Sequence, residues 1–223
     1  MWGVCVKQRN DGAVKKYIVN EVFYTLQGEG FHSGRAAIFC RFSRCNLWTG
    51  REEDRAKAIC QFCDTDFLAG TAYTLAGLCS LIDSLWVGSE MDKFIVFTGG
   101  EPALQLDQQL VDAIRELGYY VAVESNGTLP LPTVDWVCVS PKGGSVLPTH
   151  IVADEIKLVY PQEKLMPDHL TDTYELSFKE DCLWLSPMDG PNVQENTQLA
   201  VDYVMANPMW RLNIQTHKTV GIR

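Results

Sequence analysis

The segment KFIVFTGGEPALQLDQQLVDAIRELG, residues 93–118, contains an apolar run, a glycine-bearing turn and a second patterned run. The first run is apolar from Phe94 onward and ends in glycines, which is typical of a parallel strand covered on both faces. The second run repeats leucine and isoleucine at helical spacing, and Gly118 is suited to end that helix. The segment therefore predicts a strand followed by a helix, the unit from which parallel α/β sheets are built.

The same alternation extends in both directions from this unit. Upstream, residues 36–42 (AAIFCRF) predict a buried strand, and residues 75–85 have helical apolar spacing with Thr74 as a candidate N-cap. Residues 51–58 (REEDRAKA) predict a short exposed helix. Downstream, four short apolar runs are each followed by polar or glycine-rich residues: YYVAVESNG (119–127), VDWVCVSPK (134–142), IKLVY (156–160) and LWLSPMDG (183–190).

The whole pattern predicts a single α/β domain. A last helix at 195–208 (ENTQLAVDYVMANP) and a final strand at 211–218 (RLNIQTHK) complete it. The last strands read as joined by short loops, and 223 residues fall short of the roughly 250 of a complete eight-unit barrel. We therefore expect a shortened, open TIM-like (β/α) barrel over residues 1–223, with residues 1–16 as an N-terminal extension and the site at the C-terminal ends of the strands.

Composition narrows the class of protein. The formal net charge is -9 at pH 7, so we expect no nucleic acid and no membrane as partners, because both are bound through a clustered positive field. No apolar run approaches the roughly 20 residues that cross a bilayer, and the N-terminus lacks the apolar centre of a signal peptide. A cytoplasmic location is therefore expected. The eight cysteines are expected to be reduced, because 46% hydrophobic residues supply a core without disulfides.

Three of the cysteines have the spacing of metal ligands. Fourteen residues separate Cys45 from Cys60, and two separate Cys60 from Cys63. Three thiolates without an obvious fourth protein ligand match three corners of a cubic [4Fe–4S] cluster whose last iron binds something else. Zinc is the alternative metal, but structural zinc takes four ligands and the four histidines show no paired spacing.

A second candidate is TGGEP, residues 98–102, at the end of the strand quoted first. Paired glycines let backbone groups approach a ligand closely, and Glu101 is able to accept a hydrogen bond from an ammonium group. A Gly-Gly turn alone is a weak signal. Here the Gly-Gly turn directly follows a predicted strand and comes after the cysteine triplet in the sequence. In this context it indicates a ligand site beside the cysteines.

Together these motifs resemble the radical S-adenosylmethionine family. In that family three cysteines hold a [4Fe–4S] cluster, a GGE-type motif meets the methionine amino group, and one-electron reduction cleaves S-adenosyl-L-methionine to a 5′-deoxyadenosyl radical. Most members have a shorter first spacing than the fourteen residues found here. Some members of one enzyme group within the family carry the same long spacing.

That group is the 7-carboxy-7-deazaguanine synthases, and the resemblance runs from about Tyr17 to the C-terminus. The shared motifs are YTLQGEG (24–30), CRFSRCNLW (40–48), CDTDF (63–67), TGGEP (98–102), ESNG (124–127), SPK (140–142), PMDG (187–190) and QTHK (215–218). The resemblance implies a lyase of queuosine and deazapurine biosynthesis, which contracts the ring of 6-carboxy-5,6,7,8-tetrahydropterin to give 7-carboxy-7-deazaguanine and ammonia. It also implies Mg²⁺, a reducing partner such as flavodoxin or ferredoxin, and a homodimer.

The resemblance assigns roles to particular residues. The cluster ligands are Cys45, Cys60 and Cys63, and the Mg²⁺ ligand is Thr65. The implied substrate contacts are Leu26, Gln27, Gly28, Glu29, Arg41, Thr98, His217 and Arg223. The implied cofactor contacts are Phe62, Asp64, Gly100, Glu101, Glu124, Asn126, Ser140, Pro141, Lys142, Ser186, Pro187, Met188 and Asp189. Two positions depart from the group: Ser186 stands where close relatives carry glutamine, and residues 216–223 read THKTVGIR where relatives carry THKYLNIR.

Residue chemistry agrees with the implied substrate, although two other functions stay open. The Arg41 guanidinium is able to fork onto a carboxylate, and Gln27 is able to read the amide edge of a pterin. One alternative is a radical enzyme that activates or modifies another macromolecule, which the compact length disfavours. The other is a zinc-stabilised module without catalysis.

Overall fold

The computed structural model describes residues 15–222. The predicted N-terminal extension therefore lies outside the described residues except for Lys15 and Lys16, and Arg223 lies outside them as well. The strands are β1 (Tyr17–Leu26), β2 (Ala36–Phe42), β3 (Thr71–Tyr73), β4 (Phe94–Gly99), β5 (Tyr120–Ser125), β6 (Trp136–Val139), β7 (His150–Val152), β8 (Glu155–Tyr160), β9 (Glu175–Ser177), β10 (Leu183–Pro187) and β11 (Arg211–Leu212). The helices are α1 (Leu75–Leu85), α2 (Gln108–Glu116), α3 (Pro167–Thr173), α4 (Val193–Ala206) and α5 (Thr216–Val220), with 3-10 turns η1 (Glu52–Lys57), η2 (Glu90–Asp92) and η3 (Pro102–Leu104).

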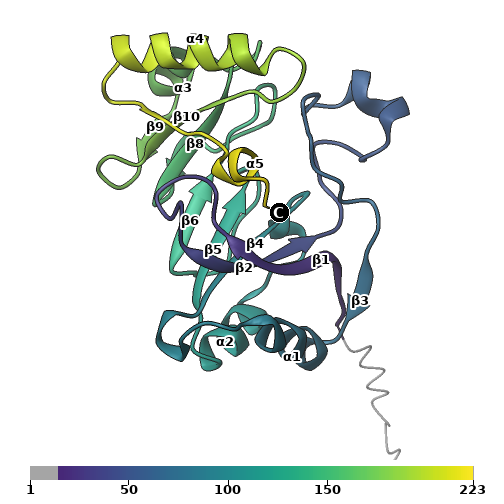
Figure 1. The fold of residues 1–223 in the computed structure, drawn as a ribbon. Helices are drawn as coiled ribbons and strands as arrows, with labels where there is room; N and C mark the ends of the chain where they lie inside the picture. Colours follow the sequence, from purple (N-terminus) through teal and green to yellow (C-terminus); the bar gives the residue numbers. More distant parts are fainter. Residues whose placement is uncertain (1–14, 223) are drawn as a thin grey trace, which may run out of the picture.

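Nine strands form one curved sheet, in the order β11-β10-β8-β6-β5-β4-β2-β1-β3, and β7 pairs with β9. All pairings from β2 to β11 are parallel, whereas β1 runs antiparallel to both β2 and β3. Figure 1 shows α1 and α2 at one end of this sheet and α3 and α4 at the other. Because β11 and β3 are the two ends of the order and do not pair, the prediction of an open, shortened (β/α) barrel is confirmed.

Side chains alternate between the two faces of the parallel strands. The outer face packs under α1 and α2, and its apolar cluster takes every second residue of three strands: Ile38, Cys40, Phe42, Ile95, Phe97, Val121 and Val123. The inner face is apolar near the strand starts, where Ala37, Phe94, Val96, Ala122 and Trp136 form a cluster of their own. Near the strand ends the inner face becomes polar. This change of polarity places the ligand-accessible groups at the C-terminal ends of the strands, as predicted.

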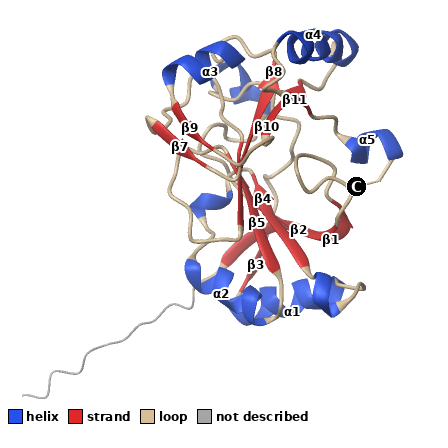
Figure 2. Cartoon of the chain, turned by 90° about the vertical axis from the view of Figure 1, so that its left-hand side faces the viewer, coloured by secondary structure: helices blue, strands red, loops and turns tan. Residues whose placement is uncertain are grey.

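Two helix ends beside β4 match the sequence prediction, namely the start of α1 at Thr74 and the end of α2 at Gly118, whereas α2 begins at Gln108 and not at Leu104. The side chain of Thr74 accepts a hydrogen bond from the Gly77 amide at 3.2 Å, which caps α1. Asp107 caps α2 in the same way, since its carboxylate accepts from the Leu110 amide at 3.0 Å. Gly118 follows with φ 89°, a conformation that ends the helix without strain in glycine. Figure 2 shows both helices packed against the strands around β4 and β5.

The second half of the sheet has its own core under α3 and α4. Its buried members include Ile156, Leu158, Leu170, Leu183, Leu185, Ala200 and Trp210. The prediction that loops, and not full helices, join the last strands holds for β5 to β6 and for β6 to β8, although the second connection is long and contains β7. It is wrong for β8 to β10 and β10 to β11, which are connected by α3 and α4. Full helices are therefore present between β8 and β11, where the sequence predicts only short loops.

Two predicted elements differ from the structure. The predicted strand 211–218 is wrong beyond Leu212, because Asn213 turns the chain out of the sheet by donating to Ser186 Oγ at 2.8 Å, and α5 follows. The predicted helix 51–58 is a 3-10 turn, η1, whose residues are all at least partly exposed. Six residues without a buried face are too few to sustain an α-helix.

Two global expectations bear on the class of protein. The cysteines within residues 15–222 are all free, with Cys40, Cys138 and Cys182 buried in the core, as predicted for reduced thiols. In the same part of the chain, every helix is too short or too polar to span a lipid bilayer.

Candidate active site

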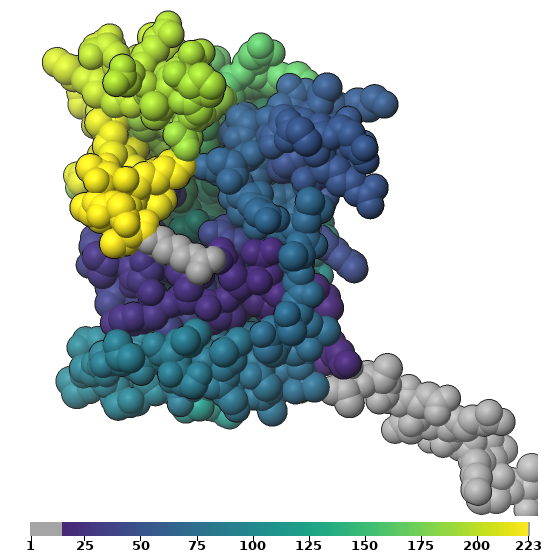
Figure 3. Space-filling model, turned by 45° about the vertical axis from the view of Figure 1, so that its right-hand side comes forward, coloured from purple at the N-terminus to yellow at the C-terminus, as the bar shows by residue number. Residues whose placement is uncertain are grey.

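A cavity of about 620 Å³ opens at the C-terminal ends of the parallel strands. The walls around its mouth are formed by three segments that are far apart in sequence: the β1–β2 turn, residues 45–67 and residues 215–218. Figure 3 shows the hollow between the segment of residues 45–67 (blue) and the C-terminal segment (yellow). Its volume lies in the range of small-molecule sites.

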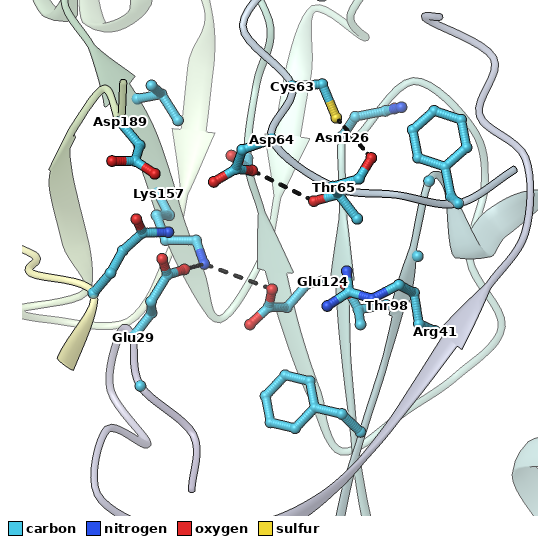
Figure 4. Close-up of a pocket in the computed structure, with 18 of the residues that line it drawn as sticks. Glu29, Arg41, Cys63, Asp64, Thr65, Thr98, Glu124, Asn126, Lys157 and Asp189 are labelled. Carbon is cyan, nitrogen blue, oxygen red and sulfur yellow. Dashed lines mark hydrogen bonds and ion pairs between the residues drawn. The ribbon is translucent and has the colours of Figure 1, made fainter. Parts of the chain in front are cut away.

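The strand register builds the floor of the cavity. Arg41 on β2 lies beside Thr98 on β4, and both face inward because their neighbours in sequence pack under the helices. Glu124 follows on β5 and Lys157 on β8. Figure 4 shows these side chains aimed into one space. Four strands thus deliver two cations, a carboxylate and a hydroxyl to the same floor.

Lys157 forms ion pairs with two carboxylates at the centre of this floor. Its Nζ contacts Oε2 of Glu29 and lies 3.6 Å from Oε2 of Glu124, and its side chain is 8% exposed. Burial opposes the charge on Lys157, but Glu124 and Glu29 outweigh burial and raise its pKa well above the ordinary value. Burial also acts to raise the pKa of Glu29, yet the attraction of Lys157 outweighs it and holds that pKa below the ordinary value. Lys157 and Glu29 are therefore both charged at neutral pH.

The β1–β2 turn is tied to the floor and to the C-terminal segment. Gln27 Nε2 donates to Glu124 Oε1 at 2.9 Å, and its Oε1 accepts from the Glu29 amide at 3.1 Å. The carbonyl oxygen of Gly28 accepts from the Thr216 amide at 3.0 Å. Residues separated by most of the chain are therefore hydrogen-bonded across the mouth of the cavity.

Gly30 completes this turn against β8 and the segment after β11. It has φ 66°, its amide donates to Asn213 Oδ1 at 2.8 Å, and a β-carbon there would lie 2.4 Å from Glu155 Oε2. The buried Glu155 carboxylate accepts from the Phe31 amide at 2.9 Å and from Trp136 Nε1 at 2.9 Å. The turn is thus fixed by buried hydrogen bonds on both sides and needs glycine where it approaches Glu155.

The three cysteines of the predicted cluster line one wall of the cavity. The Cys60 thiol donates to Cys63, which lowers the pKa of Cys63 to about 6, whereas burial raises the pKa of Cys45. No three histidine, cysteine, aspartate or glutamate side chains among residues 15–222 converge as ligands of one metal ion. Three thiols on one wall are donors of the kind that a [4Fe–4S] cluster takes, one to each of three irons.

Glu101 of the TGGEP motif lies behind the cavity wall, because donors on the protein side already surround its carboxylate. It is fully buried, and its oxygens accept from Ser125 Oγ at 2.8 Å, the Asn126 amide at 2.8 Å and the Ala103 amide at 2.9 Å. Burial raises the pKa of Glu101. In this structure Glu101 therefore holds the strand ends that carry Ser125 and Asn126, both of which line the cavity.

Asp64 and Thr65 face the cavity directly after the third cysteine (Figure 4). Thr65 Oγ1 lies 3.5 Å from Asp64 Oδ1. Lys218 of α5 lies 2.8 Å from Asp64 Oδ2 and also pairs with Asp189 on the loop after β10. Lys218 therefore bridges the cysteine segment and the β10 loop across the cavity.

Most residues assigned from the resemblance surround this one cavity. Those that line it are Leu26, Gln27, Gly28, Glu29, Arg41, Cys45, Cys60, Phe62, Cys63, Asp64, Thr65, Thr98, Gly100, Glu124, Asn126, Ser140, Lys142, Ser186, Pro187, Asp189 and His217. Glu101, Pro141 and Met188 lie outside the lining. Pro141 is buried, and the Met188 backbone is taken up by Tyr160 and Asn196. Arg223 is outside the described residues.

Sequence reasoning missed several lining residues, of which Lys157 and Lys218 are charged and central. One signal for Lys157 was present, because a lysine inside the apolar strand run 156–160 is unusual unless it has a buried partner. Lys218 belongs to the QTHK motif, so its position in a shared motif was a signal as well.

Similar proteins match the sequence over nearly the whole chain. The chain is 51% identical over 216 residues to 7-carboxy-7-deazaguanine synthase of Bradyrhizobium diazoefficiens, covering 93% of this chain and 99% of that protein. The chain belongs to the 7-carboxy-7-deazaguanine synthase family. The synthase of Caulobacter vibrioides is 49% identical over 213 residues, covering 92% of this chain and 99% of that protein.

A solved structure agrees with the family and with the fold. The crystal structure of QueE from Escherichia coli matches with a TM-score of 0.66 and 27% identity, covering 91% of this chain and 95% of that one. No protein-family model matches the chain. The predicted resemblance to the 7-carboxy-7-deazaguanine synthases is confirmed by these relatives.

Proposed function

We propose that this chain is a radical S-adenosylmethionine lyase that converts 6-carboxy-5,6,7,8-tetrahydropterin into 7-carboxy-7-deazaguanine and ammonia. Membership of the synthase family supports this reaction. The observation that carries the proposal is one cavity with three free cysteines on one wall and a floor of polar and charged side chains below them. Such a cavity joins a site for a reactive cluster to a site for a small polar molecule.

In this proposal Cys45, Cys60 and Cys63 hold three irons of a [4Fe–4S] cluster and leave the fourth for S-adenosyl-L-methionine. When bound, the cluster and its cofactor supply the radical that abstracts hydrogen from the substrate. The chain contributes three thiols on one wall of the cavity, and each would ligate iron as the thiolate. The proposed cofactor contacts in the cavity lining are Phe62, Asp64, Gly100, Glu124, Asn126, Ser140, Lys142, Ser186, Pro187 and Asp189, and Glu101, Pro141 and Met188 belong to the same proposed set from behind the wall.

The proposed substrate site is the floor and the β1–β2 turn. Arg41 Nε donates to Glu21 at 2.9 Å, which orients the guanidinium and leaves its outer N–H groups suited to the substrate carboxylate. The ionised Glu29, together with Glu124, suits the N–H groups of the aminopyrimidinone ring. The remaining proposed contacts are Leu26, Gln27, Gly28, Thr98, His217 and Arg223.

Thr65 is the proposed protein ligand of Mg²⁺. Its hydroxyl lies at the cavity surface beside Asp64. Magnesium commonly takes one or two protein oxygens and completes its shell with water and substrate oxygens. A single hydroxyl therefore suffices when the substrate carboxylate supplies a further ligand.

The same proposal includes the domain organisation, oligomeric state, location and electron donor of the enzyme. It acts as one domain over residues 1–223 with residues 1–16 as an extension, as a homodimer, in the cytoplasm, with electrons from a flavodoxin or ferredoxin. The net charge of -9 supports a small-molecule substrate, as opposed to a nucleic acid.

An anaerobic assay of the reconstituted chain with the carboxytetrahydropterin tests the proposal. We expect iron and sulfide in the protein, formation of the deazaguanine and loss of both in Cys63→Ala. Cys182→Ala, at a buried cysteine of the core, is the matched control and is expected to keep the cluster. Colourless protein with one zinc and no iron would overturn the radical chemistry. Cofactor cleavage without deazaguanine would favour the alternative of a radical enzyme acting on a macromolecule.

A further inference from the structure

The fourteen residues between Cys45 and Cys60 fold into a small unit of their own. Trp48 is 8% exposed, and its ring packs edge-on against Phe67 at 5.6 Å between centroids. Thr49 Oγ1 donates to Asp54 Oδ2 at 2.8 Å, and the Ile59 amide donates to the Leu47 carbonyl at 3.0 Å. The long spacing between these cysteines is therefore occupied by ordered structure around η1.

Arg55 lies at the centre of this unit and contacts three parts of it. Its Nη1 donates to the carbonyl oxygens of Gln61 at 2.9 Å and Cys63 at 3.0 Å. Its Nε donates to the two carboxylate oxygens of Glu52 at 2.7 and 2.9 Å. Its guanidinium carbon lies 4.1 Å from the centre of the Trp48 ring. The guanidinium thus joins the segment after the first cysteine to the loop that carries the second and third.

We propose that Arg55 is a positioning residue for the cysteine triplet. It fixes the Cys60–Cys63 loop relative to the segment that follows Cys45, and its positive charge lies beside the Cys63 backbone. The inference rests on the proposed function, because it takes the three cysteines to be ligands of one cluster. It assigns a task to the insertion that distinguishes this chain from shorter-spaced radical enzymes.

The geometry explains why arginine suits this task. Nη1 donates to two carbonyl oxygens while Nε is fixed by a carboxylate, so the donors lie on two separate nitrogens of one rigid plane, whereas the three donors of an ammonium all lie on one atom. The Trp48 ring supports the flat face of the guanidinium from a further side. A loop with two residues between its ligands is thereby prevented from opening when the cluster is absent or exchanging.

Three variants separate the contributions of Arg55. Arg55→Met keeps an unbranched apolar stem against Trp48 but removes the donors and the charge. Arg55→Lys keeps the charge without the fork. Arg51→Met is the matched control, because Arg51 lies in the same unit but is exposed and pairs with Glu53 at 3.8 Å.

Hydrogen exchange of the peptide spanning 59–68 and bleaching of the cluster by a chelator are measured on the reconstituted full chain. We expect both rates to rise by roughly tenfold or more in Arg55→Met, the scale of losing hydrogen bonds from a charged donor. Arg51→Met is expected to match the wild type. Equal rates in wild type, Arg55→Met and Arg55→Lys would overturn the inference.

The midpoint potential of the cluster distinguishes positioning from a merely structural role. A nearby positive charge favours the reduced cluster, so Arg55→Met is expected to shift the potential to more negative values, and Arg55→Lys to restore it without restoring slow exchange. If Arg55→Met fails to fold, Arg55→Lys still tests the inference through exchange and bleaching. Wild-type protein that takes up no iron would refute the proposed function itself, whereas iron uptake with no effect of Arg55 would refute this inference alone.

Discussion

Gly28 and His217 are in such close contact that a β-carbon on Gly28 would lie 2.2 Å from Nδ1 of the His217 ring. Real β-carbons essentially never approach a heavy atom this closely, so the contact requires glycine. It joins the β1–β2 turn to α5 at the edge of the cavity, where both residues line the wall. The proposed substrate side of the cavity therefore depends on the contact between Gly28 and His217, and this contact requires that residue 28 has no side chain.

Gly28→Ala is expected to push His217 and α5 away from the turn. We expect a loss of about 1–3 kcal/mol in the free energy of unfolding, as for other overpacked contacts, and a raised KM for the pterin. Denaturant titration and steady-state kinetics measure the two effects. Because the three nearest atoms all belong to the His217 side chain, Gly28→Ala should cost much less in a His217→Gly background. An equal cost in both backgrounds would refute the contact as its cause.

Lys157→Met is expected to destabilise the fold strongly at neutral pH. The substitution leaves Glu29 and Glu124 without the buried ammonium that pairs with them, and breaking a buried ion pair in this way costs about 3–5 kcal/mol. Equilibrium unfolding in urea measures the change. Lys57→Met, at an exposed lysine of η1, is the control and should stay within about 0.5 kcal/mol of wild type.

The cost of Lys157→Met is also expected to depend on pH. In the wild type the pKa of Glu29 is held below its ordinary value, so Glu29 contributes stability above about pH 4.5, which is lost as the pH falls through the lowered pKa. Without Lys157, burial raises the pKa of Glu29, and the folded variant then takes up a proton on acidification. The stability difference between wild type and variant should narrow from about pH 7 to about pH 5. A constant difference over that range would contradict the ion pair.

Glu101→Gln is expected to lower the melting temperature. The amide group replaces one accepting oxygen with a donor. That donor then faces either the Ala103 amide, on the Oε1 side shared with Ser125 Oγ, or the Asn126 amide on the Oε2 side, which costs about 1–3 kcal/mol for an unsatisfied buried group. Differential scanning calorimetry measures the shift. Glu116→Gln, at an exposed glutamate of α2, is the control. Equal melting temperatures for the two variants would show that the buried carboxylate is not needed as an acceptor.

Thr65→Ala is expected to weaken the magnesium dependence of the reaction. Removing the hydroxyl should raise the Mg²⁺ concentration for half-maximal rate by roughly tenfold, the lower end of what supporting groups at metal sites contribute. Titration of Mg²⁺ in the anaerobic assay measures the shift, with Thr71→Ala on β3 as the control. An unchanged titration would remove Thr65 from the metal site.

The fold was predictable where local pattern and tertiary packing agree. The strand before TGGEP and the helix after it carry their own periodicity and caps, and both form as predicted. The strand predicted through Asn213 fails because the Asn213 side chain bonds to Ser186 and Gly30, contacts that no local pattern encodes. Tertiary hydrogen bonds override local propensity at that point.

Site residues could be predicted where they belong to a compact sequence motif. They were harder to predict where their role depends on a contact with a residue far away in sequence. The cysteines and the β1–β2 turn were found because each is a compact motif. Lys157 was missed because the apolar strand around it suggests a buried partner but does not identify one, and that partner, Glu29, is 128 positions away in sequence. The position of Glu101 behind the wall was missed for a similar reason, since its hydrogen-bond donors include residues from the next strand.

The short helix α5 contributes to the cavity but has no buried residue of its own. The last strand of the sheet ends at Leu212, and within residues 15–222 the apolar clusters contain no residue beyond it. Residues 216–222 therefore serve the cavity more than the core, and substitutions at their exposed positions are able to change ligand handling at little cost in stability.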